Sequence, residues 1–300
     1  MKFLRHFLAG YRLSFARFDH EQFGVPRPQA RGCLATLLSN PRILIALLFI
    51  GGALAKYYLG TTTEQNPFTG RVQKLAAEMD TPEEEMAMGL ASAPRMIQEF
   101  GGEHTDAQAR AMVQRVGQRL VDSTKVRDTP YKFRFTLLRD PQTINAFALP
   151  GGQIFITAAL FKALESEDQL AGVLGHEIGH VVGRHSTQQM AKSGLIQGLA
   201  QGAAVAMSDG HSNSGAQIAQ MVGNMITMKY GREDEYESDA LGVEFMIQSG
   251  YNPEAMIGVM DILKKASGGG SRPEITSTHP DPGNRAEHIR EQIARYRQGK

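Results

Sequence analysis

The chain has 300 residues, a formal net charge of +1 and a single cysteine, Cys33. This length is sufficient for one large domain or two small ones, and the near-zero net charge gives no global electrostatic argument for nucleic-acid binding. One cysteine excludes an internal disulfide framework and any metal site built from several cysteines. The distribution of charge along the chain is more informative than its sum.

The first 42 residues form a basic N-terminal segment, in which seven Lys and Arg residues oppose two acidic residues. An uncharged apolar run follows, and we interpret residues 43–59 as a transmembrane anchor, about 26 Å long as a helix. Lys56 and the tyrosines after it suit a membrane interface. The preceding positive charge predicts a cytoplasmic N-terminus and places the remainder across the membrane. A buried helix, a signal peptide cleaved near Ala55, or a mitochondrial transit peptide at the N-terminus are alternatives.

Beyond the anchor, residues 60–70 are typical of a polar linker, and we expect residues 71–300 to form one folded domain. Within that domain, residues 71–100 are a helix-prone acidic stretch, and the periodicity of 106–123 predicts an amphipathic helix. Residues 131–137 alternate in polarity and predict a strand, and residues 153–157 predict a second strand. Helical patterns follow to the end of the chain. The predicted fold class is α+β, mostly helical with a small β-sheet and preceded by one transmembrane helix.

The segment His176-Glu177-Ile178-Gly179-His180 indicates a zinc site. Two histidines four residues apart on a helix project from the same face, so both imidazoles can bind one metal ion. The glutamate beside the first histidine can then act on a metal-bound water molecule. We therefore expect His176 and His180 to be metal ligands and Glu177 to be catalytic.

Local signals favour a helix around this motif. Ser166 precedes Gln169 by three residues, which is a capping-box pattern, and an apolar periodicity continues to about residue 185. Gly175 and Gly179 oppose this prediction, because each costs about 1 kcal/mol relative to alanine in an exposed helix. A second helix packed closely against these two glycines would account for them.

A catalytic zinc ion requires a third protein ligand, and the acidic run at 232–239 offers one. Glu235 and Asp239 are four residues apart and share a helix face. Glu235 can bind the metal while Asp239 accepts a hydrogen bond from a ligand histidine and fixes its tautomer. Glu233 and Glu237 are rival ligands, and a solvated acidic helix face is the alternative to any metal site. The expected cofactor is one Zn²⁺ per chain.

His-Glu-x-x-His followed by Glu-x-x-x-Asp resembles the membrane-associated zinc metallopeptidases that include HtpX, the CAAX prenyl protease and the Oma-type and BepA-type proteases. The likeness covers about residues 70–295, including 145–154 and 279–285. It implies a zincin-like domain in which the strand after the Gly-Gly pair is an edge strand that pairs with an extended substrate. The residues that would form it are Gly152, Gln153 and Ile154. One transmembrane segment without a C-terminal repeat array is closer to the Oma-type and short periplasmic members.

The same resemblance implies that His279, in a loop near Arg285, approaches the zinc and regulates access to it. An ordinary loop histidine that packs near Arg285 is the alternative.

Together these features predict a zinc-dependent endopeptidase that hydrolyses membrane or misfolded envelope proteins in protein quality control. Zinc would activate water, and Glu177 would take the water proton and deliver it to the leaving amine. The expected partners are protein substrates and the lipid bilayer, without nucleic acid. The expected location is a bacterial inner membrane with a periplasmic catalytic domain, or the mitochondrial inner membrane. A zinc-fold chaperone or assembly factor with rare proteolysis is the alternative function, and a secreted thermolysin-like protease is disfavoured by the anchor.

Overall fold

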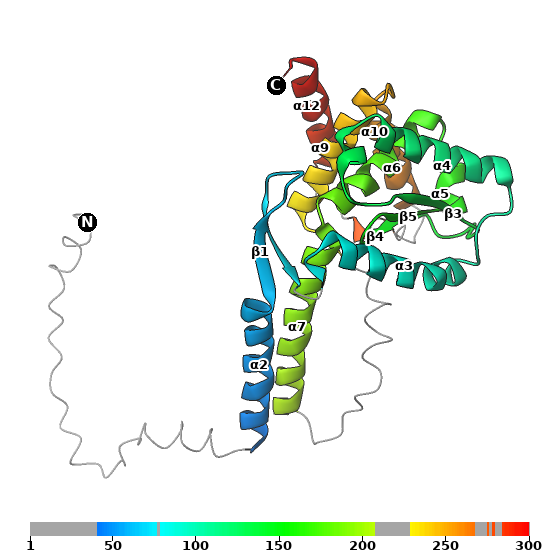
Figure 1. Ribbon diagram of the computed structural model, residues 1–300. Helices are drawn as coiled ribbons and strands as arrows, with labels where there is room; N and C mark the ends of the chain where they lie inside the picture. The colour runs from blue at the N-terminus through cyan, green and yellow to red at the C-terminus, as the bar shows by residue number, and fades with distance from the viewer. Residues whose placement is uncertain are drawn as a thin grey trace, which may run out of the picture. The chain divides into compact units, whose positions relative to one another are not determined.

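The structure is a computed structural model, and it describes residues 41–76, 79–207, 229–267, 275, 278–279 and 284–299. Most of the basic N-terminal segment and the loop after His279 lie outside these residues. The chain divides into two compact units, Met1–Leu44 and Ile45–Lys300, and the second carries nearly all the described residues. This unit is mostly helical with two small sheets, in agreement with the predicted α+β class (Figure 1).

The first helix, α2 (Pro41–Leu59), lies where the transmembrane anchor was predicted. Among the described residues, however, no helix combines the length and the apolar content that a membrane crossing requires. The uncharged run Ile43–Ala55 extends only about 20 Å as a helix, against a bilayer core of about 30 Å. The prediction of a transmembrane helix at 43–59 is therefore not confirmed.

An antiparallel hairpin replaces the predicted linker. Its strands are β1 (Thr61–Gln65) and β2 (Val72–Ala76), with Thr61 opposite Ala76. The turn closes because the Asn66 side chain accepts hydrogen bonds from the backbone N–H groups of Phe68 and Thr69. The polar composition of 60–70 obscured the β-branched threonines that favour the first strand. The linker prediction is wrong, and this segment belongs to the folded body.

The second sheet has three strands in the order β3-β5-β4. These are β3 (Arg134–Leu138), β4 (Ala146–Leu149) and β5 (Gln153–Thr157). Strand β5 runs parallel to β3 and antiparallel to β4. It is therefore the central strand, so the predicted substrate edge at Gly152, Gln153 and Ile154 is wrong. The positive φ of Gly151 and Gly152, 79° and 107°, folds the short strand β4 back along β5 and leaves β4 as an edge.

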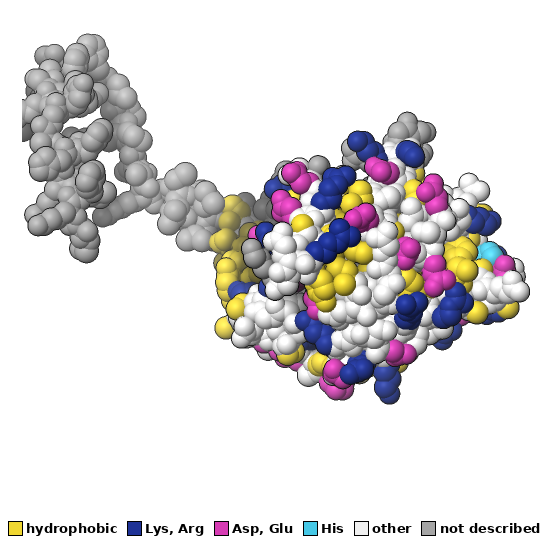
Figure 2. All heavy atoms as spheres, turned by 90° about the horizontal axis from the view of Figure 1, so that it is seen from above, with side chains coloured by type: hydrophobic (Ala, Val, Ile, Leu, Met, Phe, Trp, Pro, Cys, Tyr) yellow, Lys and Arg dark blue, Asp and Glu magenta, His cyan; other side chains and the backbone are white. Residues whose placement is uncertain are grey.

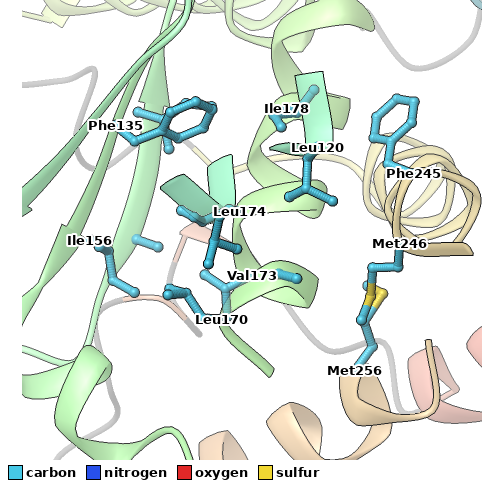
Figure 3. Close-up of a cluster of buried hydrophobic side chains, with 14 of the residues drawn as sticks. Leu120, Phe135, Ile156, Leu170, Val173, Leu174, Ile178, Phe245, Met246 and Met256 are labelled. Atoms are coloured by element: carbon cyan, nitrogen blue, oxygen red, sulfur yellow. The ribbon is translucent and has the colours of Figure 1, made fainter. Parts of the chain in front are cut away.

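Helices cover both faces of this sheet (Figure 1). On one side, α3 (Pro82–Glu99) contributes to a cluster with Phe147 and Phe155. On the other side, α4 (Ala107–Asp122) and α6 (Glu167–Val182) form the main core. Figure 3 shows Leu170, Leu174 and Ile178 of α6 between the strand residues Phe135 and Ile156 and the helix residues Phe245 and Met246. Helix α6, which carries the segment His176–His180, therefore lies at the centre of the main core.

Six further elements complete the described part of the chain. They are η3 (Lys125–Asp128), α5 (Ala158–Ala163), α7 (His185–Met207), α9 (Arg232–Gln248), α10 (Ala255–Ser267) and α12 (Arg285–Arg297). On the face in Figure 2, basic and acidic side chains are interspersed, as the near-zero net charge suggests.

The start of α6 is capped as predicted, since the Ser166 hydroxyl accepts from the Gln169 N–H at 3.2 Å. Its end lies before residue 185, because Arg184 adopts a left-handed φ of 57° and α7 begins in a new direction. The Arg184 guanidinium is buried and binds Glu64 at 2.6 Å and Glu85 at 3.0 Å. The end of α6 is thereby joined to β1 and α3.

Close packing of α6 against α9 explains the motif glycines. A Cβ atom at Gly179 would lie 2.9 Å from the Ser238 Cα atom, and one at Gly175 would lie 3.3 Å from the Gly242 Cα atom. Larger residues at these two positions would separate the helices. The glycines therefore bring the histidines of α6 within reach of Glu235 on α9.

Candidate active site

Four side chains with metal-binding atoms converge in the interior: His176, His180, Glu235 and His279. One ligand atom from each lies within 4.8 Å of all the others, and all four residues are buried. The Nε2 atoms of His176 and His180 are 3.0 Å apart, and His279 Nδ1 lies 3.3 Å from His176 Nε2 and 3.0 Å from Glu235 Oε1. The structure therefore brings the sequence-predicted ligands together with the predicted regulatory histidine.

The donor set fits a divalent cation. Three buried carboxylates, Glu177, Glu235 and Asp239, face one buried guanidinium, Arg285. If the carboxylates are ionised and the histidines neutral, as metal binding requires, two formal negative charges remain uncompensated in the interior, where unpaired charge is costly. The buried Glu177 Oε2 and His279 Nε2 atoms also have no hydrogen-bond partner. Imidazole nitrogens and a carboxylate at this spacing are typical zinc ligands.

Asp239 and Arg285 surround the cluster. Asp239 Oδ1 lies 2.9 Å from His176 Nδ1, so the carboxylate can hold that ring with Nε2 directed at the cluster. Arg285 binds Asp239 at 2.6 Å and 2.8 Å, and it also binds Glu235 Oε2 at 2.8 Å. Arg285 therefore contacts both acidic residues of α9 that the sequence assigns to the site.

The two rival acids of α9 lie away from the cluster. The Glu233 side chain is 87% exposed and pairs with Arg71. Glu237 contacts Arg71 and His185 instead of the four converging side chains. Two aromatic neighbours of His180 were not predicted: Tyr230 stacks on its ring with the centroids 4.0 Å apart, and His185 Nδ1 lies 2.9 Å from His180 Nδ1. No sequence spacing indicates Tyr230, because the fold alone brings it to α6.

The environment shifts the pKa values of the acidic residues in opposite directions. Burial raises the pKa of Glu177, although His279 and His176 oppose the effect. Burial acts in the same way on Glu235, but His279 and Arg285 outweigh it and hold the pKa of Glu235 well below its usual range. Burial also lowers the pKa of His180 well below its ordinary value, which favours the neutral imidazole that binds metals. Glu235 is thus poised to stay ionised, whereas Glu177 is poised to take up a proton.

An apolar pocket adjoins Glu177 and His176, between α6 and α10. Its other walls are Gly172, Val173, Met256, Val259, Met260, Leu263, Ile275, His279 and Arg285. On the sheet side, β4 packs against α6, and the backbone N–H of Ile275 donates to the Ile144 carbonyl just before β4. Both amide atoms of the buried Asn145 side chain, at the start of β4, have no hydrogen-bond partner. The edge strand and the segment that carries His279 are therefore neighbours.

Comparison with known proteins identifies relatives of this chain over most of its folded region. The model of peptidase family M48 matches residues 107–293. The beta-barrel assembly-enhancing protease of Escherichia coli K12 is 32% identical over 189 residues, which cover 61% of this chain and 38% of that protein. The metalloprotease YcaL of the same organism is 27% identical, covering 59% of this chain and 70% of YcaL.

A third relative is the mitochondrial metalloendopeptidase OMA1 of Schizosaccharomyces pombe, which is 30% identical and is matched over 60% of this chain and 51% of its own length. The chain thus spans well under half of the first relative and about half of OMA1. The family match extends from α4 to α12 and includes every residue of the four-residue cluster. It confirms the resemblance to this group of metallopeptidases: the chain belongs to peptidase family M48.

Proposed function

We propose that this chain is a zinc-dependent endopeptidase that hydrolyses peptide bonds of protein substrates. The observation that carries the proposal is the buried convergence of His176, His180 and Glu235, with the unpartnered carboxylate oxygen of Glu177 beside them. These three residues would hold the ion. A bound zinc ion would supply a Lewis acid that acidifies water and polarises the scissile carbonyl.

Glu177 would serve as the general base and then as the general acid. Its raised pKa brings the carboxylate closer to the pH at which it can accept a water proton and return it to the leaving amine. Asp239 would keep His176 in the tautomer that presents Nε2 to the metal. Arg285 would keep both Glu235 and Asp239 ionised, because it pairs with each of them.

For substrate binding, we infer that an extended peptide pairs with the outer edge of β4. This strand is an edge of the sheet, packs against α6 and begins at the unpartnered amide of Asn145. Main-chain hydrogen bonds to such an edge do not depend on the substrate sequence. Selectivity would come from the pocket beside Glu177, whose Val, Met, Leu and Ile walls suit an apolar substrate side chain.

We also propose that α2 associates with a membrane and that the substrates are membrane or misfolded envelope proteins. Several large apolar residues of α2 are exposed, with Leu48 68% exposed. The names of two relatives support this setting, since one refers to β-barrel assembly and the other to mitochondria. Protein quality control is the role that fits such substrates.

The test uses the purified full-length chain, metal analysis and an unfolded casein-type substrate. Wild type and Glu177→Gln should each contain one zinc ion, and Glu177→Gln should lose proteolysis by about 10²- to 10⁴-fold, because an amide cannot accept the water proton. Glu235→Ala should lose zinc and activity together. Glu233→Ala, which changes an exposed acid on the same helix, should keep both.

Cleavage by a zinc-replete Glu177→Gln protein would contradict the general-base role. Full zinc content in Glu235→Ala would remove that residue from the ligand set. A wild-type chain that binds zinc and unfolded protein without cleaving it would favour the chaperone alternative.

A further inference from the structure

A second imidazole stands behind the candidate ligand His180. His185 Nδ1 lies 2.9 Å from His180 Nδ1, and His185 Nε2 lies 2.7 Å from Glu237 Oε2. The Glu237 carboxylate in turn accepts a hydrogen bond from Arg71 Nη1 at 2.9 Å. A chain of contacts therefore runs from the metal cluster through His185 and Glu237 to Arg71, whose side chain is 39% exposed.

The chemistry of these atoms fixes the direction of each hydrogen bond. His180 Nε2 belongs to the converging cluster, so its lone pair faces the cluster and its proton is on Nδ1. The Nδ1–H group must donate to His185 Nδ1, which therefore carries a lone pair and leaves the His185 proton on Nε2. That proton is donated to the Glu237 carboxylate, which can only accept. The carboxylate thus selects the tautomer of His185, and His185 selects the tautomer of His180.

Packing holds His185 in this position. The residue is fully buried, and a Cβ atom at Gly183 would lie 2.5 Å from its Nε2 atom. The Ser238 hydroxyl lies 3.3 Å from His185 Nδ1, beside the close contact of α6 with α9. The ring is therefore buried between the end of α6 and helix α9.

The two candidate histidine ligands differ in their outer partners. His176 contacts a carboxylate directly through Asp239. Among the described residues, no carboxylate contacts His180 Nδ1, and on that side of the ring His180 reaches Glu237 through His185. Outer partners of this kind orient a ligand and increase its basicity, and their loss costs about 10- to 100-fold in metal affinity.

We propose that His185 and Glu237 are positioning residues for the metal ligand His180, with Arg71 holding the Glu237 carboxylate in place. The inference rests on the proposed zinc site. Under this proposal, Glu237 is neither a direct metal ligand nor simply part of a solvent-exposed acidic helix face. It also makes the turn before β2, which carries Arg71, part of the support of the metal centre.

The matched pair Glu237→Gln and Glu233→Gln tests this proposal. Both glutamates are on α9 and both pair with Arg71, but Glu237 alone of the two contacts His185. Zinc affinity of the full-length chain would be measured by competition with a chelator, and thermal unfolding would be measured on the metal-free proteins. Glu237→Gln should bind zinc at least tenfold more weakly, with metal-free unfolding close to that of wild type, whereas Glu233→Gln should bind within twofold of wild type.

His185→Phe provides a second variant, because the ring is retained while the acceptor of the His180 Nδ1–H is removed. It should weaken zinc binding by about 10- to 100-fold. Substitution with Co²⁺ gives an independent signature, since both His185→Phe and Glu237→Gln should change the visible absorption of the bound ion. If Glu237→Gln matches wild type in zinc affinity and in its cobalt spectrum, the positioning role is overturned, but the proposed zinc site is not. A wild-type chain that binds no metal would overturn the proposed zinc site as well.

Discussion

His279 gives the candidate site four protein donors where catalysis requires three. A tetrahedral zinc ion bound by His176, His180, Glu235 and His279 would have no position left for water. The His279 Nε2 atom also lies 3.7 Å from Glu177 Oε1, so this side chain contacts the proposed base as well as the cluster. We therefore predict that His279 leaves its observed position before hydrolysis begins.

Replacing His279 with Ala should raise the basal rate of proteolysis, including self-cleavage, without lowering the zinc content. The three remaining donors suffice to hold the ion, and the fourth position becomes open to water. Initial rates on an unfolded substrate and metal analysis of the same preparation would provide the measurement. A large fall in zinc content would show instead that His279 is a permanent ligand, and unchanged rates would favour an ordinary structural histidine.

At the level of elements, the site depends on how closely α6 approaches α9. Gly179 lies between His176 and His180 in the chain, and the backbone of Ser238 on α9 packs directly against it. A methyl group there cannot be accommodated by a side-chain rotation, because the nearest atoms belong to the backbone. The helices would have to move apart, and Glu235 would move with α9.

Gly179→Ala should destabilise the protein by about 1–3 kcal/mol, which is typical of overpacking, despite the better helix propensity of alanine. Gly194→Ala is the matched control on α7, since nothing lies within 4 Å of a Cβ atom built there. It should be neutral or stabilising by up to about 1 kcal/mol. Chemical denaturation of both metal-free proteins would compare them. Equal stabilities would indicate that the α6–α9 contact adjusts without cost.

The elements also show which parts of the fold local sequence could specify. The helix around 106–123 and the start of α6 were predicted closely, because Asp106 and Ser166 cap them through their own side chains. The order of the strands was not, since β4 has only four residues and all are buried on both faces. Which strand lies at an edge depends on partners far along the chain, and no local pattern encodes it.

The same contrast holds for the site. Spacing on one helix was sufficient to indicate His176, Glu177, His180 and, on a second helix, Glu235. The contacts of His185 and Glu237 depend on the direction in which α7 leaves α6 after Arg184, and this turn has no strong sequence signal. A left-handed φ at a residue other than glycine is rare, so the sequence favoured a longer α6.

On the scale of the whole molecule, the exposed apolar side chains of α2 require an explanation that the folded body does not provide. Leu47 is 47% exposed and Leu48 is 68% exposed, although both stand in the most apolar stretch of the chain. Contact with lipid would remove this surface from water, at about 25 cal/mol per Å² of apolar area.

The double substitution Leu47→Gln with Leu48→Gln should therefore shift the full-length chain from the membrane fraction toward the soluble fraction. Leu90→Gln is a suitable control, because Leu90 is also 60% exposed but lies on α3. Fractionation of cells that express each variant, before and after carbonate extraction, would measure the shift. A wild-type chain found wholly in the soluble fraction would contradict membrane association.

The buried guanidinium of Arg184 has a mechanical consequence. It binds Glu64 of the hairpin, Glu85 of α3 and the backbone carbonyls of Met79 and Asp80, all at the end of the helix that carries both histidines. The hairpin directly continues α2, with the Gly60 N–H bonded to the Lys56 carbonyl. A force applied to α2 would therefore be transmitted to α6 through the ion pairs and hydrogen bonds of Arg184. Tension on the chain would then change the geometry of the candidate active site.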